Sequence, residues 1–506
     1  MTAASGDLPA ADEYPADAHG ERGAPRLAGR AATPALLVVL FASFMDLLDV
    51  TIVTVAAPDV AGDLHASPAQ LQWMLAAYTL ALGSGLITGG RVGDDYGRRR
   101  VFLGSLACFA IASAACALAP TAAVLIAVRV LQGLAGGFMV PQVFGIIRSS
   151  FAPAAAAKAF GAYGAVQGLA SVAGPLLGGA LVDADLWELG WRTIFWINIP
   201  VALVALAVGS RVLAESRAPA RTRRDVLGAV LAAVGVLLVL LPLVQGRDWG
   251  WPAWGWALLA AGVAVLALFL GYERRLARRG GEPVLDPGLL SVRPFTAGLA
   301  ASVLFFGGLA SFFLTLSIYL QSGTGRSAWD AGLVILPYAI GSMLTSGAGV
   351  ALAARAGRAL LVTGSLILAA AQGLLWWLVR DGDAPGYRHL AAVMLLGGLG
   401  LGLAAPILVN VVLAGVPGRR AGAAGGVLST VNQIGGAVGV AVLGTVFFDA
   451  LATGTAAPGA APTGAGDEAA AFGHALAQVM PWQVATYLLA AAAMLALPRT
   501  AVPHQA

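Results

Sequence analysis

Residues 34–57 read PALLVVLFASFMDLLDVTIVTVAA, an apolar run that carries two acids, Asp46 and Asp49. A helix needs about 20 apolar residues to cross the hydrocarbon core of a bilayer, and this run is long enough. Each charge at the bilayer centre costs roughly 2.5–3.5 kcal/mol on insertion scales, so such residues persist where they are compensated or used. The run therefore predicts a membrane-spanning helix with two functional candidates.

The rest of the chain has a similar composition. Of its 506 residues, 58% are hydrophobic and 11% are charged, against about 25% charged in an ordinary soluble domain. This balance excludes a soluble enzyme and a disordered chain, because too little charge remains to cover a soluble surface. The 66 glycines fit the close packing of helices in lipid. We expect an all-α integral membrane protein.

Apolar runs of spanning length recur along the whole sequence. We expect fourteen transmembrane helices, near residues 34–57, 69–91, 99–119, 121–145, 158–182, 193–213, 225–246, 254–273, 294–321, 329–353, 358–380, 388–412, 421–448 and 479–498. The long stretch between the last two, 449–478, is rich in Ala, Gly and Pro and is predicted to be a loop.

The basic residues predict the orientation. Most of the 30 Lys and Arg fall on the side of the two termini, whereas the opposite side carries Arg192, Arg247, Arg326, Arg380 and Arg388. Because basic loops stay in the cytoplasm, we expect a multi-pass protein of the bacterial inner (cell) membrane with both termini cytoplasmic. The net charge of +4 is then a sign of topology, and nucleic acid is not an expected partner.

An internal repeat predicts the domain organisation. Gly97-Arg98, followed by Gly104-Ser105-Leu106, recurs as Gly357-Arg358, followed by Gly364-Ser365-Leu366, eight spans later. This spacing indicates two six-helix units with two helices inserted between them, an arrangement of parallel repeats found in transporters. The expected segments are a cytoplasmic tail (1–33), an N-terminal six-helix bundle (34–213), linkers with two inserted helices (214–293), a C-terminal six-helix bundle (294–498) and a cytoplasmic tail (499–506).

Three charged residues lie inside spans: Asp46, Asp49 and Arg129. Asp46 and Asp49 are three residues apart and share one helix face. Two neighbouring carboxylates repel, and burial disfavours the charged form, so at least one could hold a proton near neutral pH. Arg129 could pair with either carboxylate and tune its affinity for protons. The alternative reading is structural, in which these groups only cap or pair neighbouring helices.

Six motifs resemble the major facilitator superfamily, and within it the fourteen-span drug:proton antiporters. They are the loop motif Gly90–Arg99, the span-four motif Arg129–Gly133, the antiporter motif Gly174–Gly179, the span-one signature Leu48–Val53, and the runs Trp191–Pro200 and Asn432–Gly439. The resemblance covers about residues 34–498. The loop motif departs from the family pattern at Asp95, where Arg is usual, and the second half has Ala354 where the first has Asp94.

The resemblance implies roles for two of these motifs. A conformational latch of Gly90, Asp94, Gly97 and Arg98 would stabilise the outward-open state, with Asp94 paired to Arg98 or to a helix N-terminus across the bundle interface. The antiporter motif, with Gly174, Pro175, Gly178 and Gly179, would bend span five and close the substrate path against leakage. Simple anchoring and simple packing are the alternatives for these two motifs.

The resemblance also places a substrate cavity between spans one, four, nine and twelve. The candidate substrate-binding residues are Asp46, Asp49, Gln132, Phe305, Phe306, Phe312, Phe313, Tyr319 and Asn410. Aromatic walls and an anionic group suit a lipophilic cation. No His or Cys cluster suggests a metal site. No G-x-x-x-x-G-K-[ST] loop is present, so we expect no cofactor and a proton gradient as the energy source.

We therefore expect a proton-coupled multidrug exporter, not an enzyme, that works by alternating access. Asp49 is the expected coupling acid, Asp46 shares its proton or binds cationic substrate, and Arg129 modulates both. Its partners would be small lipophilic substrates, protons and the lipid bilayer, and we expect a monomer. Two alternatives remain: a narrow exporter of one metabolite or antibiotic, and a lipid flippase.

Overall fold

The computed structural model describes residues 32–216, 225–247, 249–281, 283–380, 385–414, 416, 421–455 and 465–497, and in these residues every regular element is helical. Apart from Ala32 and Thr33, the two predicted tails lie outside the described residues. The expected span end at 498 and the basic run Arg221–Arg224 also lie outside them. Ten described helices are long and apolar enough to cross a membrane. The expectation of an all-helical membrane protein is confirmed to this extent.

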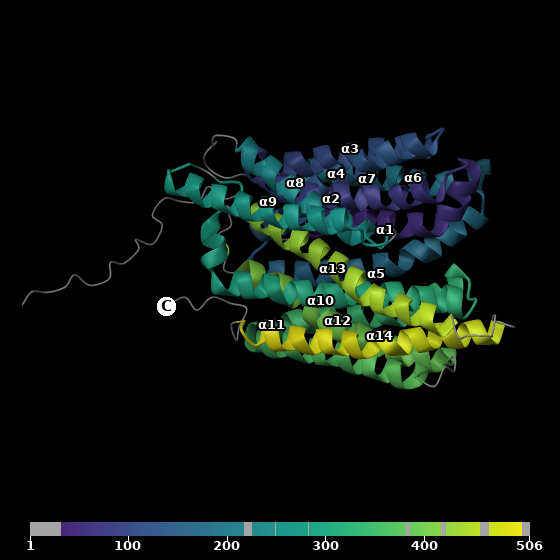
Figure 1. Ribbon diagram of the computed structural model, residues 1–506. Helices are drawn as coiled ribbons and strands as arrows, with labels where there is room; N and C mark the ends of the chain where they lie inside the picture. The colour runs from purple at the N-terminus through teal and green to yellow at the C-terminus, as the bar shows by residue number, and fades with distance from the viewer. Residues whose placement is uncertain are drawn as a thin grey trace, which may run out of the picture.

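Figure 1 shows two groups of long helices that run side by side. The first group comprises α1 (Ala32–Asp63), α2 (Pro68–Tyr96), α3 (Arg98–Ala117), α4 (Ala122–Ser150), α5 (Pro153–Asp183), α6 (Thr193–Trp196) and α7 (Asn198–Val212), with the short helices η2 (Leu186–Glu188) and η3 (Gly190–Arg192) before α6. The second comprises η4 (Pro287–Ser291), α10 (Arg293–Ile318), η5 (Tyr319–Gly323), α11 (Ala328–Val379), α12 (Tyr387–Ala414), α13 (Ala421–Thr455) and α14 (Ala465–Met494). Between them in the chain come α8 (Val226–Gln245) and α9 (Ala253–Arg278).

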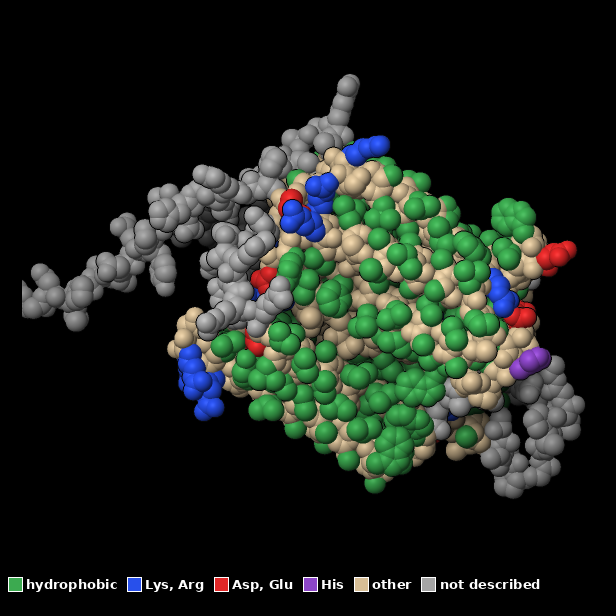
Figure 2. Space-filling view, turned by 90° about the horizontal axis from the view of Figure 1, so that it is seen from above, with side chains coloured by type: hydrophobic (Ala, Val, Ile, Leu, Met, Phe, Trp, Pro, Cys, Tyr) green, Lys and Arg blue, Asp and Glu red, His purple; other side chains and the backbone are tan. Residues whose placement is uncertain are grey.

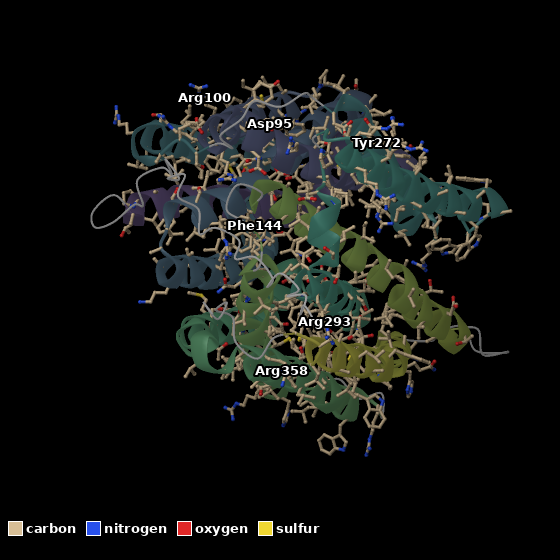
Figure 3. The ribbon with its side chains drawn as sticks, turned by 90° about the vertical axis from the view of Figure 1, so that its left-hand side faces the viewer. Asp95, Arg100, Phe144, Tyr272, Arg293 and Arg358 are labelled. Carbon is tan, nitrogen blue, oxygen red and sulfur yellow. The ribbon has the colours of Figure 1, made fainter. Side chains whose placement is uncertain are left out.

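Helix α11 combines two predicted spans. Its 52 residues would extend about 78 Å as one straight helix, far beyond the thickness of a bilayer. The helix is broken at Ala356, whose φ of −135° and ψ of 26° are not helical. The loop expected at Gly357-Arg358 is therefore a sharp bend at this residue. This bend lies at the end of the molecule that carries Arg100, Arg293 and Arg358, here called the basic end (Figure 3).

One predicted loop was wrong. Residues 465–478 belong to α14, and α13 continues to Thr455, so the expected loop 449–478 is largely helical. The physical reason is the alanine content of the stretch before His474, because alanine has the highest helix propensity. The alanine-rich stretch therefore favours a helix, and α14 begins well before the expected span at 479–498.

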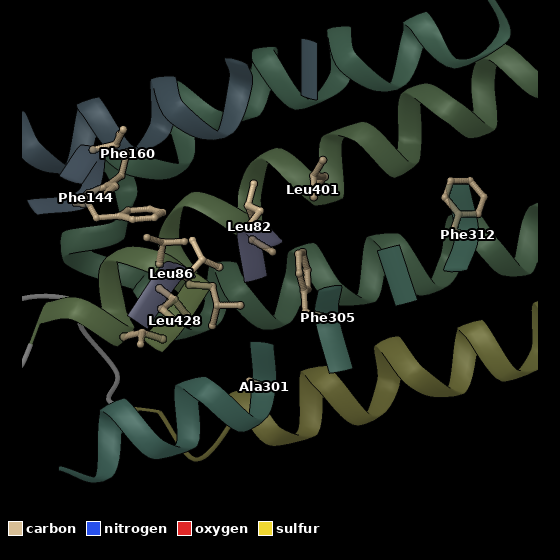
Figure 4. Close-up of a cluster of buried hydrophobic side chains, with 14 of the residues drawn as sticks. Leu82, Leu86, Phe144, Phe160, Ala301, Phe305, Phe312, Leu401 and Leu428 are labelled. Atoms are coloured by element: carbon tan, nitrogen blue, oxygen red, sulfur yellow. The ribbon is translucent and has the colours of Figure 1, made fainter. Parts of the chain in front are cut away.

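The two groups meet along α5, which packs on α11 and α12, and along α13, which packs on α2 and α4. Buried side chains from both groups form one continuous apolar cluster, including Leu82, Phe144, Phe305 and Leu401 (Figure 4). The inserted helix α8 packs on α9, on α2 and on α13, so it contacts both groups.

Lipid-facing surface is most extensive on α9. Only 17% of the most apolar stretch of α9 is buried, against 67% for the corresponding stretch of Tyr387–Leu413. The exposed side chains of α9 include Trp254, Trp256, Val263 and Leu268. Seen from above, apolar side chains cover the middle of the molecule and the charged groups gather at its two ends (Figure 2). This distribution matches a bilayer around the middle of the protein.

Opposite the basic end, Asp63 on α1 accepts hydrogen bonds from Arg192 Nη1 at 2.6 Å and from Trp191 Nε1 at 3.1 Å. These hydrogen bonds, that of Arg192 first, lower the pKa of the Asp63 carboxyl. The contact ties the end of α1 to the segment that precedes α6.

The crossing of α2 and α4 depends on glycine. A Cβ built on Gly137 would lie 2.6 Å from the Leu82 carbonyl oxygen and 3.1 Å from Gly85 Cα. Both neighbours are backbone atoms, so they can move only if the helices separate. Small residues at such crossings are the usual means of close helix packing in lipid.

We therefore predict that Gly137→Ala destabilises the protein by about 1–3 kcal/mol, the usual cost of overpacking. Thermal unfolding of the purified protein in detergent would measure this as a lower midpoint. Gly104→Ala on α3 is the matched control, because a Cβ at Gly104 meets no atom within 4 Å. Equal midpoints for the two variants would contradict the packing argument.

Candidate functional site

A cavity of about 390 Å³ lies between the two groups of helices. Its walls come from α1, α2, α4 and α5 on one side and from α10, α11, α12 and α13 on the other. The volume falls within the range of pockets that hold drug-sized ligands. Asp46 is the one charged side chain among the described residues that line the cavity.

Asp46 is held in place by α2 and α4. Tyr78 donates a hydrogen bond from its hydroxyl to Asp46 Oδ1 at 2.6 Å. A Cβ on Gly136 would lie 2.6 Å from the same carboxylate oxygen and 3.1 Å from the Tyr78 hydroxyl, so only glycine leaves room for this contact. Asp46 remains partly exposed, toward the cavity.

Asp49 points instead into a closed polar network. It is fully buried and forms an ion pair with Arg129, whose side chain is also buried. Its Oδ1 accepts hydrogen bonds from Gln132 Nε2 at 2.9 Å and from Asn198 Nδ2 at 3.0 Å. The motif Arg129–Gly133 therefore supplies two partners of this acid, three residues apart on one face of α4.

Further hydrogen bonds fix these partners. Ser113 on α3 accepts from Gln132 at 2.8 Å and from Asn198 at 3.2 Å. Arg129 also donates to Gln132 Oε1 at 2.9 Å. The charges are buried but paired and hydrogen-bonded, which is the condition under which buried charges are tolerated.

Tyr78 connects the two acids. Its hydroxyl binds Asp46, and the guanidinium of Arg129 lies over its ring at 4.3 Å from the centroid. Tyr78 therefore contacts Asp46 and the cation that pairs with Asp49. No sequence motif points to Tyr78 or Ser113, whereas Asn198 belongs to the run Trp191–Pro200.

The predicted aromatic residues divide between the cavity and the interior of the second group. Phe306 and Phe313 line the cavity. Phe305 and Phe312 are buried beside them and pack against Tyr487 and Tyr338, at centroid distances of 6.0 and 6.1 Å. The structure also places Asp49, Gln132, Tyr319 and Asn410 outside the cavity lining. Neighbouring helix residues point about 100° apart, so each Phe-Phe pair contributes one lining side chain.

Polar and aromatic side chains that sequence reasoning did not select also line the cavity. Gln167, Asn432 and Gln433 bring amide groups, and Phe144 and Tyr163 stack edge to face at 5.2 Å. The Gln167 and Asn432 side-chain oxygens are buried without a hydrogen-bond donor among the described residues. Two of these amides, Asn432 and Gln433, belong to the sequence motif Asn432–Gly439, which could have indicated them.

The residues of the predicted latch come together at the basic end. Asp94 pairs with Arg98 at 2.7 Å, and its other oxygen accepts a hydrogen bond from the backbone N–H of Ala423 at 3.0 Å. Ala423 lies in the first turn of α13, so a carboxylate from α2 meets a helix N-terminus of the opposite group. Gly97 ends α2 with a φ of 105°, a conformation that favours glycine. Gly90 lies buried within α2.

Two acids of the loop motif behave differently. Asp94 and Arg98 are almost completely buried, whereas Asp95 forms a more exposed pair with Arg91 at 3.3 Å. The departure at Asp95 thus creates a local ion pair within α2.

The antiporter motif packs α5 on α1. A Cβ on Gly174 would overlap the Thr51 side chain, which lies two residues from Asp49. Gly178 is buried, and Gly179 faces open space. The side chain of Pro175 lies outside the described residues.

Comparison with known proteins shows the family to which the chain belongs. The major facilitator superfamily profile matches residues 39–440. The chain is 42% identical over 424 residues to the probable actinorhodin transporter of Streptomyces coelicolor, covering 82% of this chain and 72% of that protein. It is 33% identical over 460 residues to the multidrug efflux pump LfrA of Mycolicibacterium smegmatis, covering 90% and 89%.

The fold is also similar to that of a solved transporter. The crystal structure of the human organic anion transporter MFSD10 aligns with a TM-score of 0.64 and 16% identity, covering 92% of this chain and 99% of that one. The family match, the relatives named as transporters and the ten described apolar helices together show a multi-pass membrane transporter and not an enzyme. By sequence and by fold, the chain belongs to the major facilitator superfamily.

Proposed function

We propose that this protein is a proton-coupled exporter that exchanges protons for lipophilic, cationic compounds. The observation that carries the proposal is the position of Asp46: it supplies the one carboxylate of the described cavity lining and is linked through Tyr78 to the Arg129–Asp49 pair. A carboxylate can bind either a proton or a cation, so Asp46 can exchange one for the other.

The geometry favours different roles for Asp46 and Asp49. Asp49 is saturated by Arg129, Gln132 and Asn198, whereas Asp46 faces the cavity. The exchangeable proton is therefore assigned to Asp46, and Asp49 holds Arg129 beside Tyr78. When Asp46 takes a proton from the outer side, it loses its charge and releases the cation. When it gives the proton to the cytoplasm, it regains its charge and binds the next cation.

The proposal includes fourteen spans arranged as six, two and six, in the bacterial cell membrane with both termini cytoplasmic. Division of α11 at Ala356 and joining of α6 with α7 support this number. The basic end would then face the cytoplasm. The Asp94 contact with α13 closes that end, which supports an outward-facing state.

The cavity favours aromatic substrates. Rings of Tyr78, Phe144, Tyr163, Phe306 and Phe313 surround it, and such rings attract both cations and flat apolar molecules. The energy would come from the proton gradient, worth roughly 2.3 kcal/mol per charge at 100 mV, without a cofactor.

A second candidate is a narrow exporter of one antibiotic or metabolite. It is favoured by a relative named for actinorhodin transport and by another, from Streptomyces glaucescens, named for tetracenomycin C resistance and export. The unpartnered Gln167 and Asn432 oxygens would suit a substrate with hydroxyl groups. A lipid flippase has no comparable support, because the described residues that line the cavity include one charged side chain, Asp46, and several aromatic rings.

We predict that Asp46→Asn abolishes substrate-driven proton release and lowers export of a lipophilic cation at least tenfold. The reason is that the amide can neither take up a proton nor balance a cation. The measurement is transport of a fluorescent cation into everted vesicles, with a pH-sensitive dye read in parallel. Asp59→Asn, an exposed acid on the same helix, is the control and should behave like wild type.

Three other outcomes separate the alternatives. Proton release with neutral antibiotics alone would favour the narrow exporter. Normal exchange by Asp46→Asn would refute the role of Asp46. No response of either dye with folded wild-type protein, followed by movement of fluorescent lipid, would favour the flippase.

A further prediction concerns the latch. Asp94→Asn should shift the protein toward the state open at the basic end, because hydrogen bonds to a charged group contribute about 1.5–3 kcal/mol, or roughly ten- to a hundredfold in population. Spin labels at Ala155 on α5 and Ala359 on α11, in a variant without Cys108 and Cys116, would report the separation of the two groups.

Asp95→Asn is the matched control, since this neighbouring acid pairs within its own helix. The expected result is a longer distance in Asp94→Asn and an unchanged distance in Asp95→Asn. Identical distributions in both variants would show that Asp94 does not hold the groups together.

A further inference from the structure

A second pair of acids lies outside the cavity, on the inserted helices. Asp225 immediately precedes α8, and Glu273 lies near the end of α9. Both belong to the basic end, where Figure 3 shows the neighbouring Tyr272 on α9. Neither acid has a part in the exchange described above.

Each acid uses one oxygen to hold the local structure. Asp225 Oδ1 accepts hydrogen bonds from the Gly228 N–H at 2.8 Å and from the Tyr272 hydroxyl at 2.9 Å. Glu273 Oε2 accepts from the backbone N–H of Leu285 at 3.3 Å, in the segment that leads to η4 and α10. The two acids therefore join the start of α8, the end of α9 and the connector to the second group.

The remaining two oxygens face each other. Asp225 Oδ2 and Glu273 Oε1 are buried, and neither has a hydrogen-bond partner among the described residues. A Cβ built on Gly228 would overlap both atoms, so the two oxygens converge over this glycine. The Glu273 side chain is 0% exposed, so bulk solvent does not reach it.

Two ionised carboxylates in this position would repel each other, and a buried charge without a partner is costly. One proton between Asp225 Oδ2 and Glu273 Oε1 removes one charge and supplies the missing donor. A divalent cation fits less well, because Ca²⁺ and Mg²⁺ need about six or more oxygen ligands, and among the described residues that meet here two carboxylate oxygens lack a partner.

Several other charged groups lie on the neighbouring elements. Arg274, Arg275 and Arg278 lie on α9 itself, Asp286 and Arg293 lie on the connector and α10, and Arg91, Asp94 and Asp95 lie on α2. Among the described residues, Asp225 is the charged group that interacts with Glu273, and Tyr272 is the other titratable neighbour.

We propose that Asp225 and Glu273 form a second proton-binding site, which holds a single shared proton and fastens the inserted helices to the connector before α10. Loss of this proton would leave two facing carboxylates and loosen the junction. Because the site faces the basic end, it would respond to the acidity of that side and not to the contents of the cavity.

The test uses the full chain in detergent and requires no transport. Thermal midpoints of wild type should fall as the pH rises between about pH 5 and 9, the range in which buried carboxyl groups titrate. The fall should be smaller in Glu273→Gln, because the amide N–H replaces the shared proton at every pH and only other groups, such as Asp46, still titrate. Asp286→Asn on the same connector is the control and should retain the wild-type profile.

A second measurement covers the case in which Glu273→Gln fails to fold. In an Asp46→Asn background, which removes the cavity carboxyl, infrared spectra should contain a protonated-carboxyl C=O band that disappears as the pH rises. The additional change Asp225→Asn should remove this titrating band. Parallel pH profiles in wild type and Glu273→Gln, or an unchanged band in Asp225→Asn, would refute the shared proton. Stabilisation of wild type by added Ca²⁺ or Mg²⁺ at high pH, absent in Glu273→Gln, would show a metal site instead.

Discussion

The ion pair between Asp49 and Arg129 is the constraint around which the first group of helices is organised. Two opposite charges in the membrane interior are tolerated only with a complete set of hydrogen bonds, and removal of one partner from such a pair usually costs about 3–5 kcal/mol. The set is supplied by Gln132, Asn198 and Ser113, from three further positions in the fold. Helices α1, α3, α4 and α7 are therefore held in one relative orientation by a single charged centre.

The position of the charged group in the cavity depends on this ion pair. With Arg129 fixed over the ring of Tyr78, the hydroxyl of Tyr78 is aimed at Asp46. Gly136 admits the carboxylate where any side chain would displace it. The second group contributes apolar rings and neutral amides to the cavity and no charge among the described residues. The charge thus comes from the first group alone, whereas the aromatic rings come from both groups. Relative motion of the two groups would change how a bound molecule contacts Asp46 on one side and Phe306 and Phe313 on the other.

The fold brings together several groups that the sequence singled out, but the direction in which each side chain points depends on packing. Asp46 and Asp49 share a helix face by spacing, yet Asp46 faces the cavity and Asp49 a closed network. Residues three apart on a helix still point about 60° apart, so they meet different neighbours. Phe305 and Phe306 could not be separated without the rotation of α10. The partner of Asp94 was expected to include a helix N-terminus, but its identity as α13 depends on packing between residues 329 positions apart. Asp225 and Glu273 gave no signal, since their proximity exists only after α8 and α9 pair.

The attachment of α8 has a mechanical consequence. On α2, Gly83 receives the Leu240 and Val236 side chains, and Thr88 donates a hydrogen bond to the Ala229 carbonyl at 3.4 Å. On α13, the guanidinium of Arg247 rests on the face of the Phe448 ring. An interlocked contact resists displacement, whereas a cation on a flat ring can slide at little cost in energy. If the two groups rock relative to each other, the inserted helices would move together with the first group. Their contact with α13 would then slide.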